Sequence, residues 1–144
     1  MDLLGEHPAL NIKDESWRIY SRHKTLAPQY VGENAVIENS SITEGCEIYG
    51  KVSNSVLGSG VKVMPGACVV DSVIMDDCTI GEGATVSYAI LDSGVSVGKG
   101  ASIGKCKTEA KGITVIGTGI SVPDGFKVED DKMISNSSDL VKEA

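Results

Sequence analysis

The residues that most often carry acid–base or metal chemistry are scarce in this chain. Only two histidines occur among its 144 residues, His7 and His23, and both precede the repetitive part of the sequence. Histidine is the commonest general base, and a zinc site with three histidine ligands needs one more than is present. The same shortage excludes Ser/His/Asp and Cys/His arrangements along the repeats. We therefore expect no catalytic residues and no metal site.

The other reactive groups also have structural interpretations. The acidic runs Asp76–Asp77 and Glu129–Asp131 are interpreted as solvated charges at corners of the chain, and the glycine pairs in Gly81–Gly83 and Gly98–Gly100 recur periodically, unlike a phosphate-binding loop. The cysteines lack the short spacing of metal ligands. We expect them to be free thiols, as is typical of a reducing cytoplasm. They are Cys46, Cys68, Cys78 and Cys106.

Three consecutive stretches align residue for residue: Ser55–Asp71, Ser72–Tyr88 and Ala89–Lys105. Aliphatic residues recur in steps of 6, 6 and 5, so each repeat has 17 residues. A fixed short period is the signature of a solenoid. Gly, Asn and Asp residues, which adopt left-handed backbone conformations at low cost, recur three positions after aliphatic residues. These are Asn34, Gly45, Gly60, Gly66, Asp77, Gly83, Gly94, Gly100 and Gly119.

The repeat predicts an all-β fold with three short strands and three corners per coil. Steps of 6, 6 and 5 give no continuous stripe at 3.6 residues, which argues against helices. The pattern in Ile80–Thr85 and Val97–Ser102 resembles the hexapeptide repeat of left-handed parallel β-helices. We expect a single-stranded left-handed parallel β-helix of about five or six coils, preceded by a short irregular N-terminal segment.

The expected boundaries are residues 1–30 for the N-terminal segment, 31–128 for the β-helix and 129–144 for a polar cap or tail. Within the β-helix, one coil is two residues short, with Tyr49–Val52 on its shortened side, and Cys106–Gly112 is a loop. In the N-terminal segment we expect a short helix at Met1–Leu10 and a strand at Trp17–Ser21.

Composition narrows the expected partners and location. The net charge of −7 makes nucleic acid and anionic membrane surfaces unfavourable partners. No stretch of 18 apolar residues occurs, and Met1–Leu10 does not read as a signal peptide. We expect a cytoplasmic protein.

Segments outside the regular repeats resemble one particular family. The resemblance is to the C-terminal region of bacterial glucose-1-phosphate adenylyltransferase and extends from Met1 to about Val128. It is carried by Met1–Leu4 (MDLL), Trp17–Ser21 (WRIYS), Leu26–Tyr30 (LAPQY), Asn39–Gly45 (NSSITEG) and Asp71–Met75 (DSVIM).

The resemblance implies a two-part enzyme. An α/β head would make ADP-glucose and pyrophosphate from ATP and glucose 1-phosphate with Mg²⁺, and a β-helix would assemble homo- or hetero-oligomers and help to form an effector site. The head's nucleotide loop, basic catalytic residues and metal carboxylates have no counterpart here, so we expect the chain alone to need no cofactor and to be inactive.

Effectors in this family are phosphate or phosphorylated sugars. The basic cluster at residues 22–24 suits such a ligand, with Arg22 and Lys24 as candidate phosphate-binding residues and Lys127 as a weaker candidate. The alternative is a solvated loop whose charges offset a chain of −7.

Two other functions are weighed. A hexapeptide-repeat acyltransferase would need a histidine in a coil, which this chain lacks. The equivalent domain of another sugar-nucleotide pyrophosphorylase, such as a mannose-1-phosphate guanylyltransferase, is disfavoured by Trp17–Ser21 and Leu26–Tyr30.

Overall fold

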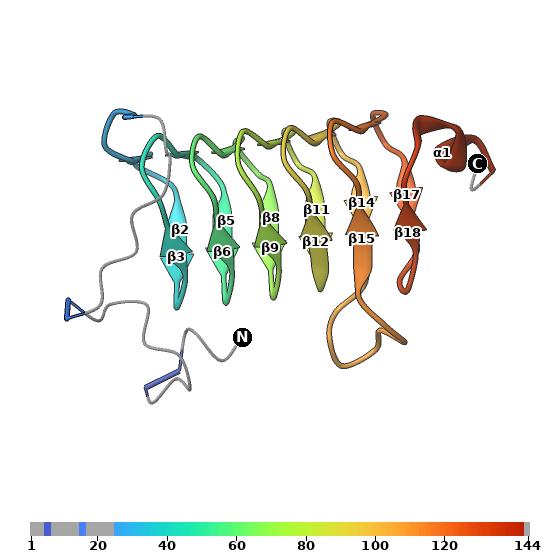
Figure 1. The fold of residues 1–144 in the computed structure, drawn as a ribbon, viewed down its shortest axis with the longest axis horizontal. Helices are drawn as coiled ribbons and strands as arrows, with labels where there is room; N and C mark the ends of the chain where they lie inside the picture. Colours follow the sequence, from blue (N-terminus) through green and yellow to red (C-terminus); the bar gives the residue numbers. More distant parts are fainter. Residues whose placement is uncertain (1–4, 7–14, 17–24, 143–144) are drawn as a thin grey trace.

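The computed structural model describes residues 5–6, 15–16 and 25–142. From Tyr30 to Ile134 the chain winds through six rungs of three short strands each, and the rungs stack side by side into a rod (Figure 1). Strands of successive rungs pair in parallel, so three six-stranded sheets run along the rod. The predicted all-β fold, a single-stranded parallel β-helix, is confirmed.

Each sheet takes one strand from every rung. The first sheet contains β1 (Tyr30–Val31), β4 (Glu47–Ile48), β7 (Lys62–Val63), β10 (Thr79–Ile80), β13 (Ser96–Val97) and β16 (Ser121–Val122). The second contains β2 (Val36–Glu38), β5 (Lys51–Ser53), β8 (Cys68–Val70), β11 (Thr85–Ser87), β14 (Ser102–Ile103) and β17 (Lys127–Val128). The third contains β3 (Ser41–Ile42), β6 (Val56–Leu57), β9 (Val73–Ile74), β12 (Ala89–Leu91), β15 (Thr114–Ile116) and β18 (Met133–Ile134).

The core is a narrow column of aliphatic side chains in register. Val63, Ile80 and Val97 pair successively in the first sheet, and none is more than 2% exposed. Because side chains alternate between the faces of a strand, the residue before each of these points outward. The sequence period therefore reflects one inward residue per strand, packed against its equivalents in the rungs on either side.

The corners largely follow the prediction. All the predicted glycines and Asp77 have positive φ, whereas Asn34, in the first rung, does not. The left-handed residues at the corner between the second and third sheets were not predicted, because this corner has no recurring glycine. They are Asn39, Asn54, Asp71, Tyr88, Gly104 and Asp131, with φ of 41°, 46°, 49°, 49°, 71° and 59°.

A ladder of serines lies beside this corner and satisfies its backbone. The hydroxyl of Ser55 donates to the carbonyl of Ser53 at 2.7 Å and accepts from the amide of Ser72 at 3.2 Å. Ser72 repeats the arrangement and accepts from the amide of Ala89 at 3.2 Å. The ladder ends there, because the next residue in the column is alanine.

The expected short coil is confirmed. Ile48 pairs with Val63, 15 residues later, whereas Val63 pairs with Ile80 after 17. The shortened side is Tyr49–Val52, as predicted. Gly50 lies at its corner, where a β-carbon would sit against the carbonyl oxygen of Ala67 in the next rung.

The expected loop at Cys106–Gly112 is also confirmed. It lengthens one coil to 25 residues, since Leu91 pairs with Ile116, yet pairing resumes in register on the far side. Figure 1 shows the loop as a large excursion from the stack of rungs, between β14 and the start of β15.

The C-terminal end differs from the expected boundary at Val128. Strand β18 adds to the third sheet, and helix α1 (Ser137–Lys142) follows it. This strand was not predicted, because the sequence around it is polar and its corner, like those before it between the second and third sheets, has no recurring glycine and uses Asp131, with φ of 59°. Leu140 of the helix is only 4% exposed and belongs to the core cluster, so the helix covers the end of the rod.

The predicted helix at Met1–Leu10 and strand at Trp17–Ser21 lie essentially outside the described residues. The segment after them lies along the first rungs. The carbonyl of Ala27 accepts a hydrogen bond from the amide of Gly45 at 2.7 Å, and Leu26 packs over Gly45.

Candidate functional site

The outer face of the third sheet carries a continuous column of apolar side chains. Its members lie in register on successive strands, and each precedes an inward core residue. We call this set the outer aliphatic column. It consists of Val56, Val73, Ile90, Val115 and Met133.

The equivalent columns on the other two sheets are mostly polar. On the first sheet the residues are Glu47, Lys62, Thr79, Ser96 and Ser121. On the second they are Lys51, Cys68, Thr85, Ser102 and Lys127. The first four members of the outer aliphatic column are half-buried by their neighbours, and Met133 is 71% exposed. One of the three faces of the rod is therefore apolar from the second rung to the last, whereas the first rung has Ser41 at the equivalent position.

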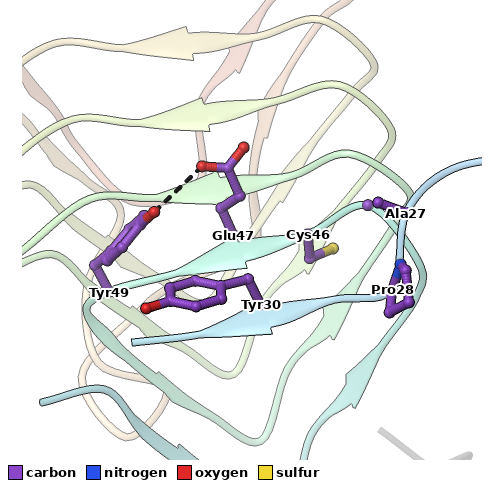
Figure 2. Close-up of a pocket in the computed structure, with 7 residues that line it drawn as sticks. Ala27, Pro28, Tyr30, Cys46, Glu47 and Tyr49 are labelled. Carbon is purple, nitrogen blue, oxygen red and sulfur yellow. Dashed lines mark hydrogen bonds between the residues drawn. The ribbon is translucent and has the colours of Figure 1, made fainter. Parts of the chain in front are cut away.

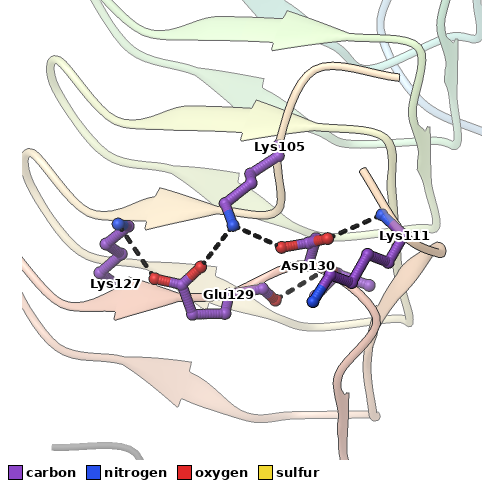
Figure 3. A network of polar contacts seen from close by, with 6 residues as sticks. Lys105, Lys111, Lys127, Glu129 and Asp130 are labelled. Atoms are coloured by element: carbon purple, nitrogen blue, oxygen red, sulfur yellow. Dashed lines mark hydrogen bonds and ion pairs between the residues drawn. The ribbon is translucent and has the colours of Figure 1, made fainter. Parts of the chain in front are cut away.

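A polar network fixes the inserted loop to the last rung (Figure 3). The ammonium of Lys105 lies 2.7 Å from the carboxylate of Asp130 and 2.9 Å from that of Glu129. At the other end of the loop, the amide of Lys111 donates to Asp130 at 2.7 Å. Asp130 thus holds both ends of the loop, and its side chain is only 6% exposed.

The network shifts the ionisation of its carboxylates. Hydrogen bonds from the Lys105 ammonium and the Lys111 amide lower the pKa of Asp130 from 3.8 to about 2. Those from Lys105 and Lys127 lower the pKa of Glu129. The carboxylates therefore stay ionised, and the loop stays anchored, well below neutral pH.

A cavity of about 260 Å³ lies between this loop and the third sheet. Val73, Ala89, Ile90 and Ile113 form its apolar lining, and Asp71, Tyr88 and Lys107 form its polar lining. We call it the loop cavity. Two of its apolar residues, Val73 and Ile90, also belong to the outer aliphatic column.

A second cavity, of about 300 Å³, lies on the outer face of the first sheet near the start of the rod (Figure 2). The rings of Tyr30 and Tyr49 line it, with centroids 5.7 Å apart and planes tilted by 49°. The hydroxyl of Tyr49 donates weakly to Glu47 at 3.4 Å, and Glu47 also pairs with Lys62 at 2.9 Å. Its charged side chain is thus already engaged by neighbours.

The four cysteines are free thiols. Burial raises the pKa of the Cys46 and Cys78 thiols, so both stay protonated at neutral pH. A hydrogen bond with the Thr108 hydroxyl lowers the pKa of the exposed Cys106 thiol. Within the described ranges, no cluster of three or more His, Cys, Asp or Glu side chains could hold a metal ion.

Of the three candidate phosphate-binding residues, the structure describes only Lys127. Arg22 and Lys24 lie outside the described residues. The weaker candidate, Lys127, pairs with Glu129 at 3.0 Å on the outer face of the second sheet. Sequence reasoning missed the loop cavity, although one signal was available: Tyr88 stands where the preceding repeats carry Asn39, Asn54 and Asp71.

The repeat also identifies the family. Residues 25–123 match the family model described as "GlmU-like, C-terminal hexapeptide", which covers more than half of the chain. The chain belongs to this hexapeptide family. The GlmU-like hexapeptide match begins just before β1 and ends just after β16, so it spans most of the rod.

Relatives of this hexapeptide chain include curated enzymes. It is 38% identical over 137 residues to a glucose-1-phosphate adenylyltransferase of Acetivibrio thermocellus, covering 89% of this chain and 32% of that protein. It is 46% identical over 93 residues to one of Bacillus mycoides, covering 65% of this chain and 25% of that protein. The chain therefore spans a third or less of these relatives' length, and its resemblance to them is confirmed.

A crystal structure of a putative acetyltransferase from Desulfovibrio desulfuricans G20 aligns with 81% of this chain and 28% of that one, with a TM-score of 0.49 and 18% identity. In the described part of the chain, no helix is long and apolar enough to cross a bilayer.

Proposed function

We propose that this chain is the non-catalytic, assembly-forming part of a glucose-1-phosphate adenylyltransferase, the enzyme that makes ADP-glucose and pyrophosphate from ATP and glucose 1-phosphate. The observation that carries the proposal is the outer aliphatic column. A rigid face with an apolar centre on one side of a rod is suited to pack against another such face.

The length of the outer aliphatic column indicates how much of an interface it could form. The five strands of the column, with spacings of about 4.8 Å, make it roughly 19 Å long. A stable interface buries about 800 Å² on each partner, with an apolar centre and a polar rim. The column has the dimensions of such a centre, so we expect the remaining area to come from the flanking corners and from the rest of the enzyme.

The partner that suits this face best is a second copy of the chain. A flat sheet face has no groove or knob that demands a different shape, and a two-fold axis brings the same surface of both copies together. Two stacked sheets pack about 10 Å apart with their side chains interlocked. Branched Val73 and Ile90 at the middle of the column would interlock in this way.

The assembly is tested by sedimentation velocity across a concentration series. Ile90→Lys should shift the chain to monomer, because a lysine ammonium would be desolvated at the centre of the interface. Thr85→Lys adds the same charge in the same rung, on the exposed face of the second sheet, and should leave the assembly unchanged. A native chain that stays monomeric at the highest concentration contradicts the proposal.

We also propose that nucleotidyl transfer depends on parts of the enzyme beyond this chain. The described residues form a packed rod whose interior is aliphatic, and among them no group of three or more His, Cys, Asp or Glu side chains could hold a metal ion. The chain incubated with ATP, Mg²⁺ and glucose 1-phosphate should release no pyrophosphate, measured by a coupled phosphate assay. Release that depends on the chain would overturn this part of the proposal.

For the regulatory role, we propose that Arg22 and Lys24 contribute to a site for phosphate or a phosphorylated sugar. Their adjacent positive charges suit a phosphate dianion. Calorimetric titration with glucose 1-phosphate should show binding that Arg22→Ala and Lys24→Ala weaken. Lys51→Ala, which removes an exposed charge on the second sheet, is the matched control. Equal weakening by all three variants would indicate a general charge effect and contradict a site.

A further inference from the structure

The loop cavity lies where the repeat changes in three ways across two neighbouring rungs. The serine ladder stops at Ala89, the corner residue becomes Tyr88, and the next rung carries the inserted loop. A bulky side chain at positive φ is uncommon, because the left-handed conformation crowds its β-carbon. These departures converge on one concave site, which the assembly face alone does not require.

Three polar side chains line this cavity without a protein partner. Within the described residues, the carboxylate of Asp71, the hydroxyl of Tyr88 and the ammonium of Lys107 make no hydrogen bond or ion pair. Several other charged side chains of the rod form ion pairs, as in Lys62–Glu47 and Lys99–Glu82. The cavity therefore offers one anion, one cation and one hydroxyl to a ligand.

The wall of the cavity is held in place before any ligand binds. Asp130 accepts from the Lys105 ammonium and the Lys111 amide, both at 2.7 Å, so the loop that carries Lys107 is fixed on both sides. The opposite wall belongs to the sheet itself. A preformed site loses little conformational entropy on binding, which favours affinity for a small ligand.

The lining selects the class of ligand. Its two charges are opposite, so a simple anion would face Asp71 and a simple cation would face Lys107. The floor is aliphatic, formed by Ile90 and Ile113 among others, and it favours an apolar body over a sugar. A volume of about 260 Å³ equals that of roughly nine water molecules.

We propose that the loop cavity binds a free α-amino acid with an aliphatic or aromatic side chain. The ligand's carboxylate accepts from the ammonium of Lys107, its own ammonium donates to the carboxylate of Asp71, and its side chain packs on Ile90 and Ile113. The Tyr88 hydroxyl supplies a further hydrogen bond. This site shares Val73 and Ile90 with the outer aliphatic column, so ligand binding and assembly through that face should compete, whereas it uses none of the residues of the proposed phosphate site.

The test is a two-dimensional amide NMR titration of the chain with L-leucine and L-phenylalanine. Saturable shifts should centre on Tyr88, Ile90, Lys107 and Ile113. Lys107→Ala and Asp71→Asn should each weaken binding about tenfold, the loss expected for one charge-assisted contact. Asparagine is accommodated at this corner in two other rungs, at Asn39 and Asn54, so Asp71→Asn should fold normally.

The matched controls separate the site from general charge effects. Lys111→Ala removes a lysine side chain of the same loop that does not line the cavity, and should bind as the native chain does. 4-Methylpentanoate, which is leucine without the ammonium, and isopentylamine, which is leucine without the carboxylate, should bind at least tenfold more weakly than leucine. Absent shifts at millimolar ligand, equal binding of 4-methylpentanoate, or binding unaffected by Lys107→Ala would each overturn the proposal.

Discussion

Gly50 determines how closely two rungs approach at the shortened coil. The coil is two residues shorter than the others because the chain turns from β4 to β5 directly over the next rung. The carbonyl of Ala67 in that rung occupies the space that a β-carbon at residue 50 would need. The requirement is steric, since the φ of Gly50 is not positive.

Gly50→Ala should lower the free energy of unfolding by about 3 kcal/mol, because the backbones of two packed rungs must separate. For a chain of this size that corresponds to a fall in Tm of roughly 10 °C in a thermal melt followed by circular dichroism.

The matched substitution is Gly100→Ala. Gly100 has a φ of 64° but open space around its β-position, so it should cost only the backbone strain of about 1 kcal/mol. A Gly50→Ala variant as stable as Gly100→Ala would show that the rungs can part without cost.

At the scale of elements, the inserted loop depends on one carboxylate. The folded-state pKa of Asp130, about 2, lies below its ordinary value of 3.8. A carboxyl group whose pKa is lower in the folded than in the unfolded state stabilises the fold while it is ionised. Its contribution is complete above the pKa of the unfolded state and is lost as the pH falls to the pKa of the folded state. The contribution of Asp130 should therefore be complete above about pH 5 and disappear toward pH 2.

Thermal melts between pH 6 and pH 2 should show this dependence as a falling Tm in the native chain. Asp130→Asn should have a lower Tm at pH 6 and a shallower fall, because it lacks the titrating group. Glu109→Gln removes an exposed carboxylate of the same loop and should follow the native curve. Parallel curves for the native chain and Asp130→Asn would show that Asp130 does not anchor the loop.

The sequence predicted the elements better than the surfaces between them. The strands, the shortened side at Tyr49–Val52 and the loop at Cys106–Gly112 follow from period and composition, because the core admits one inward aliphatic residue per strand. The left-handed conformation of Asp71 and Tyr88 was not recognised, because the third corner of each coil has no recurring glycine. The apolar outer face was also missed, because Val73 and Ile90 are understood only once the register between rungs is known.

At the scale of the whole molecule, the two ends of the rod differ in how far their apolar residues are covered. Tyr30, Val31 and Val36 of the first rung are about half exposed, whereas Leu140 of α1 is buried at the other end. In a rod each rung contacts only its neighbours, so local stability varies along its length. The central rungs, covered on both sides, should be the most resistant to opening.

Leu140→Ala should therefore destabilise one end selectively. Hydrogen exchange measured by mass spectrometry should become faster in β16 and β18, against which α1 packs, while β4 and β7 keep their native rates. A uniform increase along the rod would instead indicate that the chain unfolds as a single cooperative unit.

The continuity of strand pairing across the inserted loop has a consequence for how such a molecule can change. Leu91 and Ile116 meet as though no extra residues separated them. The length and composition of the inserted loop can therefore vary without disturbing the strands on either side. Mutations in the loop can change ligand recognition while the β-helix keeps its fold. The rod is thus a scaffold with one replaceable loop. Grafting a different peptide between Lys105 and Thr114 is the most direct way to give it a new specificity.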